Sequence, residues 1–157
     1  MRYWTLALIP VFALLSSPAQ AHCGECGVGG DAKEDHTHGE AHAAAAGAKV
    51  FFVSPADGAT VKGPVTVKMG VEGMTVQPAG QLTEGTGHHH VIIDAKGVPK
   101  GTAVPADDQH IHFGKGQTET TLELAPGEHT LTLQFADGAH RSYGPEMSAT
   151  IKVTVTE

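Results

Sequence analysis

Seven short segments rich in β-branched residues follow one another over residues 49–157, and they restrict this chain to one fold class. They span residues 49–53, 65–71, 88–94, 110–113, 118–124, 129–135 and 149–155. Most of them alternate between apolar and polar residues, which is the pattern of a strand with one buried face. Turn-forming pairs such as Asp137 with Gly138 separate the segments, and no stretch repeats with the period of a helix. We therefore predict a single antiparallel, all-β sandwich of about seven strands.

The first 21 residues have the features of an export signal. Arg2 precedes an apolar run over residues 3–15 that is too short to span a bilayer. Residues 19–21 read Ala-Gln-Ala, the small-residue pattern that signal peptidase recognises. We predict that residues 1–21 are a signal peptide cleaved after Ala21. The mature protein is then expected to be soluble, periplasmic or secreted, and without a membrane span.

Residues 22–48 consist mostly of Gly, Ala, acidic residues and His. Such a segment cannot bury an apolar face, so we predict a disordered tail over residues 22–48 and a β-sandwich domain over residues 49–157. Six residues of the tail could bind a metal ion, more weakly than a folded site: His22, Cys23, Cys26, His36, His38 and His42.

Two interpretations of the tail remain open. After cleavage, His22 would carry a free α-amine beside its own imidazole, a chelating pair suited to Cu(II). Alternatively, the tail is a solvated, low-complexity segment without a defined site. In an oxidising compartment, a disulfide between Cys23 and Cys26 is expected as readily as two free thiols.

Histidine is the residue type that most needs an explanation. The chain of 157 residues, long enough for one domain, has 11 His against 10 Lys plus Arg, and only 5% of its residues are aromatic. Its formal net charge of -7 argues against nucleic acid or an anionic membrane surface as a partner. A function based on a basic surface is therefore excluded, and one based on imidazole is favoured.

Two His-x-His pairs lie in predicted strands. Because side chains alternate along a strand, His88 and His90 share one face about 7 Å apart. His110 and His112 repeat this geometry. Four imidazoles near the same strand ends can bind one zinc, copper or nickel ion. We predict a main metal site of His88, His90, His110 and His112, whereas a single histidine would more simply bond to backbone at a polar sheet edge.

Two further residues are more speculative ligands. His140 follows the end of a predicted strand, where it could serve as a turn residue, pair with a carboxylate or bind the ion. Met74 could bind Cu(I) through sulfur, although a Met in a β-sandwich usually packs in the core. His129 alternates outward and is expected at the surface. Since no nucleophile or acid-base arrangement is recognisable, we predict that the protein is not an enzyme.

Three motifs resemble an exported bacterial family that is classified only as a domain of unknown function. They are GHHHVIID at residues 87–94, HIHFGKGQTETTLEL at residues 110–124 and PGEHTL at residues 126–131. The resemblance covers roughly residues 50–155. It implies a fold shared with the family but no established activity.

A more distant similarity runs to CopC-type periplasmic copper-binding sandwiches. It rests on SPADGAT at residues 54–60, on PGEHTL and on Asp137-Gly-Ala-His140. This resemblance implies an Ig-like/CopC-like sandwich. CopC-type chains place the N-terminal His directly before the first strand, whereas about 27 residues separate His22 from Lys49 in this chain. CopC-type chains also have an aspartate-glycine-histidine triplet, which Ala139 interrupts here. The fold therefore carries over better than the site.

Our leading hypothesis is a periplasmic metal-binding protein, copper first and zinc second, that buffers the ion or delivers it to a periplasmic partner. A second hypothesis is an adhesion or interaction module that uses no metal, in which the histidines are incidental or sense pH. A third is a small metalloenzyme, similar to copper-zinc superoxide dismutase at HIHFG or to a cupin at residues 88–94. Neither enzyme resemblance extends further along the chain.

Overall fold

The computed structural model describes residues 43–157 of the chain. The predicted signal peptide and its cleavage site lie outside the described residues, as do all six candidate ligands of the tail: His22, Cys23, Cys26, His36, His38 and His42. Within residues 43–157, no helix is both long enough and apolar enough to cross a membrane.

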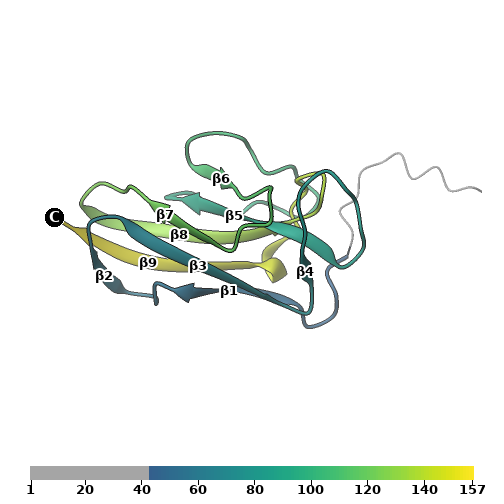
Figure 1. The fold of residues 1–157 in the computed structure, drawn as a ribbon, viewed down its shortest axis with the longest axis horizontal. Helices are drawn as coiled ribbons and strands as arrows, with labels where there is room; N and C mark the ends of the chain where they lie inside the picture. Colours follow the sequence, from purple (N-terminus) through teal and green to yellow (C-terminus); the bar gives the residue numbers. More distant parts are fainter. Residues whose placement is uncertain (1–42) are drawn as a thin grey trace, which may run out of the picture. The chain divides into compact units, whose positions relative to one another are not determined.

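The described chain forms two β-sheets packed against each other (Figure 1). The smaller sheet has the order β1 (Lys49–Ser54), β3 (Val65–Glu72), β7 (Glu119–Leu122). The larger sheet has the order β2 (Ala59–Lys62), β9 (Ser148–Thr156), β8 (Gly127–Ala136), β5 (Thr86–Ile93), β4 (Thr75–Val76), and β6 (His110–His112) also pairs with β5. A 3₁₀ helix η1 (Pro145–Met147) precedes β9. The predicted all-β sandwich is confirmed.

Two short strands, β2 and β4, are not predicted by the sequence pattern. They contain four and two residues, too few for alternation to distinguish a strand from a turn. Both pair in parallel, β2 with β9 and β4 with β5, whereas the other strand pairs are antiparallel. The sandwich is therefore antiparallel except at these two pairings.

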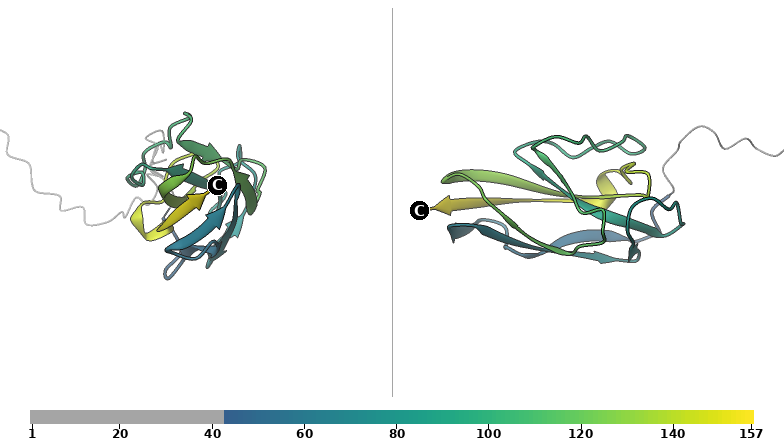
Figure 2. Two further views of the ribbon diagram at one scale, coloured as in Figure 1. Left: turned by 90° about the vertical axis from the view of Figure 1, so that its left-hand side faces the viewer. Right: turned by 45° about the horizontal axis from the view of Figure 1, so that its top comes forward.

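The main core lies between the two sheets, which appear as two layers in the right-hand view of Figure 2. Residues at alternating positions face inward from both layers: Val65, Val67 and Met69 of β3, and Ile151, Val153 and Val155 of β9. Ala44 and Ala48, which precede β1, also pack against this core. The residues just before the first strand therefore contribute apolar contacts, which their composition does not predict.

Strand β5 is buried on both of its faces. Val91 belongs to the main core, together with Leu133 of the neighbouring β8. Ile92, on the opposite face, forms a second apolar cluster with Val98, Val104 and Ala136. The connection between β5 and β6 thus covers the outer face of the larger sheet. His88 and His90 lie on the same outer face as Ile92, because side chains alternate along the strand.

Candidate metal centre

Two of the clustered histidines come from the middle of the larger sheet. His88 lies opposite Ala136 of β8, and His90 lies opposite Gln134. Their exposed fractions are 0% and 2%. The backbone of β5 is hydrogen-bonded to β8 along this stretch, so both imidazoles project from a rigid strand at fixed positions.

His112 joins them from the three-residue strand β6. It lies directly opposite His90 in the antiparallel β5–β6 pairing, and the two rings stack with centroids 4.9 Å apart and planes 17° apart. His112 is exposed, in contrast to the two histidines of β5. A side chain at Gly114 would overlap the His112 imidazole, so the absence of a side chain there makes room for the ring.

His140 reaches the same place from the turn that follows β8. Buried Asp137 fixes this turn: its Oδ1 accepts from the Ala139 and Arg141 backbone N–H groups at 2.8 and 2.9 Å, and its Oδ2 accepts from Arg141 Nε at 2.9 Å. His140 itself adopts a φ of 64°, a left-handed conformation that is uncommon for residues other than glycine. The surrounding hydrogen bonds hold this strained residue where its ring faces His88.

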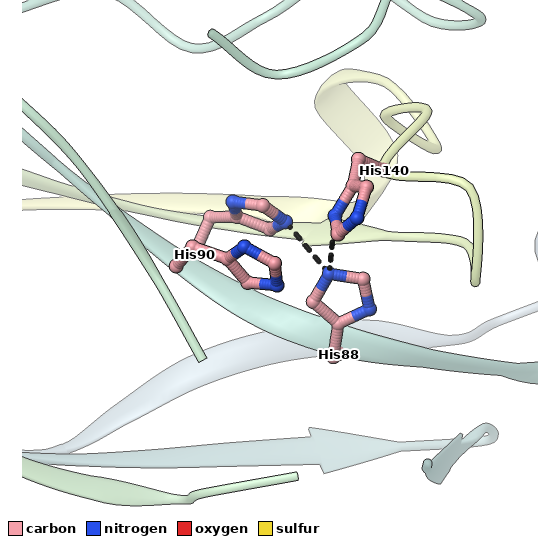
Figure 3. Close-up of side chains that lie close together, drawn as sticks. His88, His90 and His140 are labelled. Carbon is pink, nitrogen blue, oxygen red and sulfur yellow. Dashed lines mark hydrogen bonds between the residues drawn. The ribbon is translucent and has the colours of Figure 1, made fainter. Parts of the chain in front are cut away.

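The four imidazoles converge on one point, and Figure 3 labels three of them, with dashed lines from His88 to His90 and to His140. His88 Nε2 lies 3.0 Å from His90 Nε2 and 3.1 Å from His140 Nδ1. One nitrogen from each of the four rings, His112 included, lies within 4.8 Å of all the others. Ligands of a tetrahedral ion with metal–nitrogen bonds of about 2.0–2.1 Å are about 3.3 Å apart, so this spacing is close to that of a metal shell.

The surroundings keep the imidazoles of His88, His90 and His112 neutral. Burial, assisted by the neighbouring histidines, lowers the pKa of His88 from 6.5 to about 4 and that of His90 to about 2. Burial also lowers the pKa of His112, and His140 adds to the effect. A neutral imidazole has the free lone pair that a metal requires. These three histidines therefore offer their nitrogens to an ion without first losing protons at neutral pH.

The structure brings together three of the four residues that we predict for the main site: His88, His90 and His112. His110 is not part of the cluster, because it lies opposite Ile92, further along the ladder. Its Nδ1 instead lies 2.6 Å from Asp107 Oδ1. His140, one of the speculative ligands, takes the fourth position.

The other singled-out residues lie away from the cluster. Met74 packs against the main core, as is usual for a Met in a β-sandwich. His129 Nδ1 lies 2.7 Å from Asp94 Oδ2, and His129 Nε2 lies 2.9 Å from the Ala125 carbonyl oxygen. His89 points from β5 into the main core, edge-on to Phe135 with ring centroids 5.1 Å apart. Alternation along β5 thus separates His89 from its two neighbours.

Comparison with known families supports the resemblance found in the sequence. The family model described as Domain of unknown function (DUF4399) matches residues 67–156, a range that includes all four clustered histidines. The chain belongs to the DUF4399 family. Comparison with curated proteins finds no match. The comparisons do not show a link to CopC-type proteins.

Proposed function

We propose that this protein binds a first-row transition-metal ion through His88, His90, His112 and His140, and that it buffers or delivers this ion. The observation that carries the proposal is the convergence of four imidazole nitrogens within 4.8 Å of one another. The Nδ1 atoms of His88 and His90 are buried and have no hydrogen-bond partner among the described residues. Burying a polar atom without such a partner opposes folding. The Nε2 atoms of the same two rings face only other imidazoles of the cluster, and an ion bound there would take the place of these contacts.

The donor set selects the class of ion. All four donors are imidazole nitrogens, with no carboxylate oxygen or sulfur among them. Calcium and magnesium require oxygen ligands, whereas copper, zinc and nickel bind imidazole well. Copper ranks first because it binds nitrogen sites most tightly among these divalent ions, and zinc ranks second because four ligands suit its tetrahedral shell.

A role in binding is favoured over catalysis. Four protein ligands complete a tetrahedral shell, whereas a catalytic zinc site keeps one position open for water or substrate. The signal-like residues 1–21 support export to the periplasm or exterior, where the ion would be collected and passed to a partner protein. In this proposal the protein is a metal-binding protein of an exported compartment and not an enzyme.

The test compares two histidines of the same strand. His112→Ala removes a proposed ligand, and His110→Ala removes a histidine two residues away that lies outside the cluster. The mature wild-type protein and both variants, each without an affinity tag, are titrated with Cu(II) and Zn(II) by calorimetry. We expect His112→Ala to weaken affinity by at least about tenfold, since even partners that only orient metal ligands contribute that much. His110→Ala should bind as the wild type does.

Both variants retain the same N-terminal residues, so binding there cancels from the comparison. Metal analysis of the wild-type protein, purified from its native compartment, identifies the ion. Equal affinities of the two variants, or a wild-type protein that binds neither ion, would refute the proposed site. In that case the alternative of an interaction module without a metal gains support.

A further inference from the structure

The connection between β4 and β5 bridges the two loops that carry the outer ligands. We call residues 78–81 the strap. The backbone N–H of Ala79 donates to the Gly114 carbonyl at 2.9 Å, and that of Gly80 donates to the Gly138 carbonyl at 2.8 Å. Gly114 lies two residues after His112, and Gly138 lies two residues before His140. In Figure 1 the connection arches beside the loop that follows β8, at the same end of the sandwich.

The strap fits closely against the loop that carries His140. A Cβ atom at Gly138 would overlap the backbone of Gln81 in the strap. At Gly114, a Cβ atom would overlap the His112 imidazole. The loop before His140 therefore cannot move toward the strap or place a larger residue at position 138 without displacing Gln81, and a larger residue at position 114 would displace the His112 ring. The positions of His112 and His140 depend on where the strap lies.

The inner and outer ligands are held in different ways. His88 and His90 lie in β5 and are buried in the middle of the larger sheet. His112 lies in a strand of three residues and is exposed, and His140 lies in a turn. Moving the inner pair requires the sheet to separate. The outer pair can move when a few hydrogen bonds break, and these include the two that the strap makes.

We propose that the strap positions both outer ligands and controls metal exchange at this centre. When its two hydrogen bonds break, His112 and His140 loosen together while His88 and His90 retain the ion. The two metal–nitrogen bonds that are lost are replaced by bonds to an incoming acceptor with nitrogen or oxygen donors, and the ion keeps its oxidation state. This inference rests on the proposed function, since it concerns the same four histidines.

Two glycines provide a matched test. Gly80 has a φ of +108° and Gly58, in the turn between β1 and β2, has a φ of +75°; a methyl group added at either residue meets no atom within 4 Å. Gly80→Ala therefore strains only the strap, and Gly58→Ala applies the same kind of strain far from the centre. Strain of this kind raises the population of the open strap about 5- to 30-fold. We expect metal transfer to EDTA to accelerate by the same factor in Gly80→Ala and to remain at the wild-type rate in Gly58→Ala.

A second measurement uses the wild-type protein alone. If strap opening weakens metal binding, then bound metal must lower the population of the open strap by the same factor, because coupling between two equilibria is reciprocal. Hydrogen exchange of the Ala79 and Gly80 amides should therefore slow when Zn(II) is added. The Gly58 amide, which donates to the Lys152 carbonyl, should keep its exchange rate.

The outcomes separate this inference from the proposed function. A wild-type protein that binds no metal refutes the proposed function. A wild-type protein that binds metal, with equal transfer rates in both variants or no change in strap exchange, refutes the role of the strap alone. If Gly80→Ala fails to fold, the hydrogen-exchange measurement on the wild type still decides.

Discussion

Replacing His89 by leucine should make the protein more stable. His89 is fully buried in the main core, and neither of its ring nitrogens has a hydrogen-bond partner among the described residues. A buried polar group without a partner costs about 1–3 kcal/mol. Leucine has a similar volume, and repacking after a swap of this size costs less than about 1.5 kcal/mol. We expect His89→Leu to raise the free energy of unfolding by about 1–2 kcal/mol at neutral pH.

The gain should increase in acid. Burial lowers the pKa of His89 from 6.5 to about 4. As the pH falls below 6.5, the unfolded chain therefore takes up a proton that the folded protein does not, and the wild-type protein loses stability until the pH reaches about 4. At about 1.4 kcal/mol for each pKa unit, the full loss is about 3 kcal/mol. His89→Leu removes this loss, so its advantage should widen between pH 6.5 and pH 4.

Urea unfolding of metal-free protein at several pH values measures both effects. The difference between the wild-type and His89→Leu curves isolates this residue, because His88 and His90 are present in both proteins. His129→Leu serves as a contrast, since both ring nitrogens of His129 have partners and its loss should destabilise the fold. A less stable His89→Leu protein, or a constant difference across the pH range, would show that the His89 imidazole has partners and refute the reasoning.

Two other predictions concern pH. The hydrogen bond to Asp94 raises the pKa of His129, so this pair should stabilise the fold fully below pH 6.5 and lose its effect as the pH rises through the higher, folded pKa. Asp94→Asn should therefore lower the melting temperature more at pH 6 than at pH 9, and an equal loss at both would contradict an ionic contribution. Because burial lowers the pKa values of His88, His90 and His112, protons should compete with Zn(II) at the centre only in distinctly acid solution. Zn(II) affinity measured by calorimetry should then change by less than about tenfold between pH 7.5 and pH 6, and a steep fall in that interval would mean that the histidines titrate normally.

The strands that carry clear alternation could be predicted from the sequence, together with the shared face of His88 and His90. The predicted strand over residues 88–94 contains Val91-Ile92-Ile93, and it is buried on both faces. Strand β2 escaped prediction because its partner β9 lies at the other end of the domain, and β4 escaped it because it contains only two residues. Local sequence contains no signal for such short parallel pairings.

The fourth member of the cluster could not be settled from the sequence. His110 and His112 have equivalent patterns, and only the register with β5 shows that His112 lies opposite His90 while His110 lies opposite Ile92. His140 joins because Asp137 closes a turn in which His140 takes up a left-handed conformation. The Asp137-Gly138 pair did signal a turn, but not the direction of the ring. The hydrogen bonds of the strap involve only backbone atoms and leave no pattern in the side chains.

The placement of the cluster on β5 connects metal binding with folding. A strand buried on both faces is normally filled with apolar residues, yet β5 contains three consecutive buried histidines. Without an ion, their burial opposes folding, because polar rings leave water with few partners. An ion bound by His88 and His90 would offset part of this cost and, since a formed centre requires the folded sheet, would stabilise the fold by mass action. His89 faces the other side of the same strand and gains nothing from the ion, so its cost remains in either state.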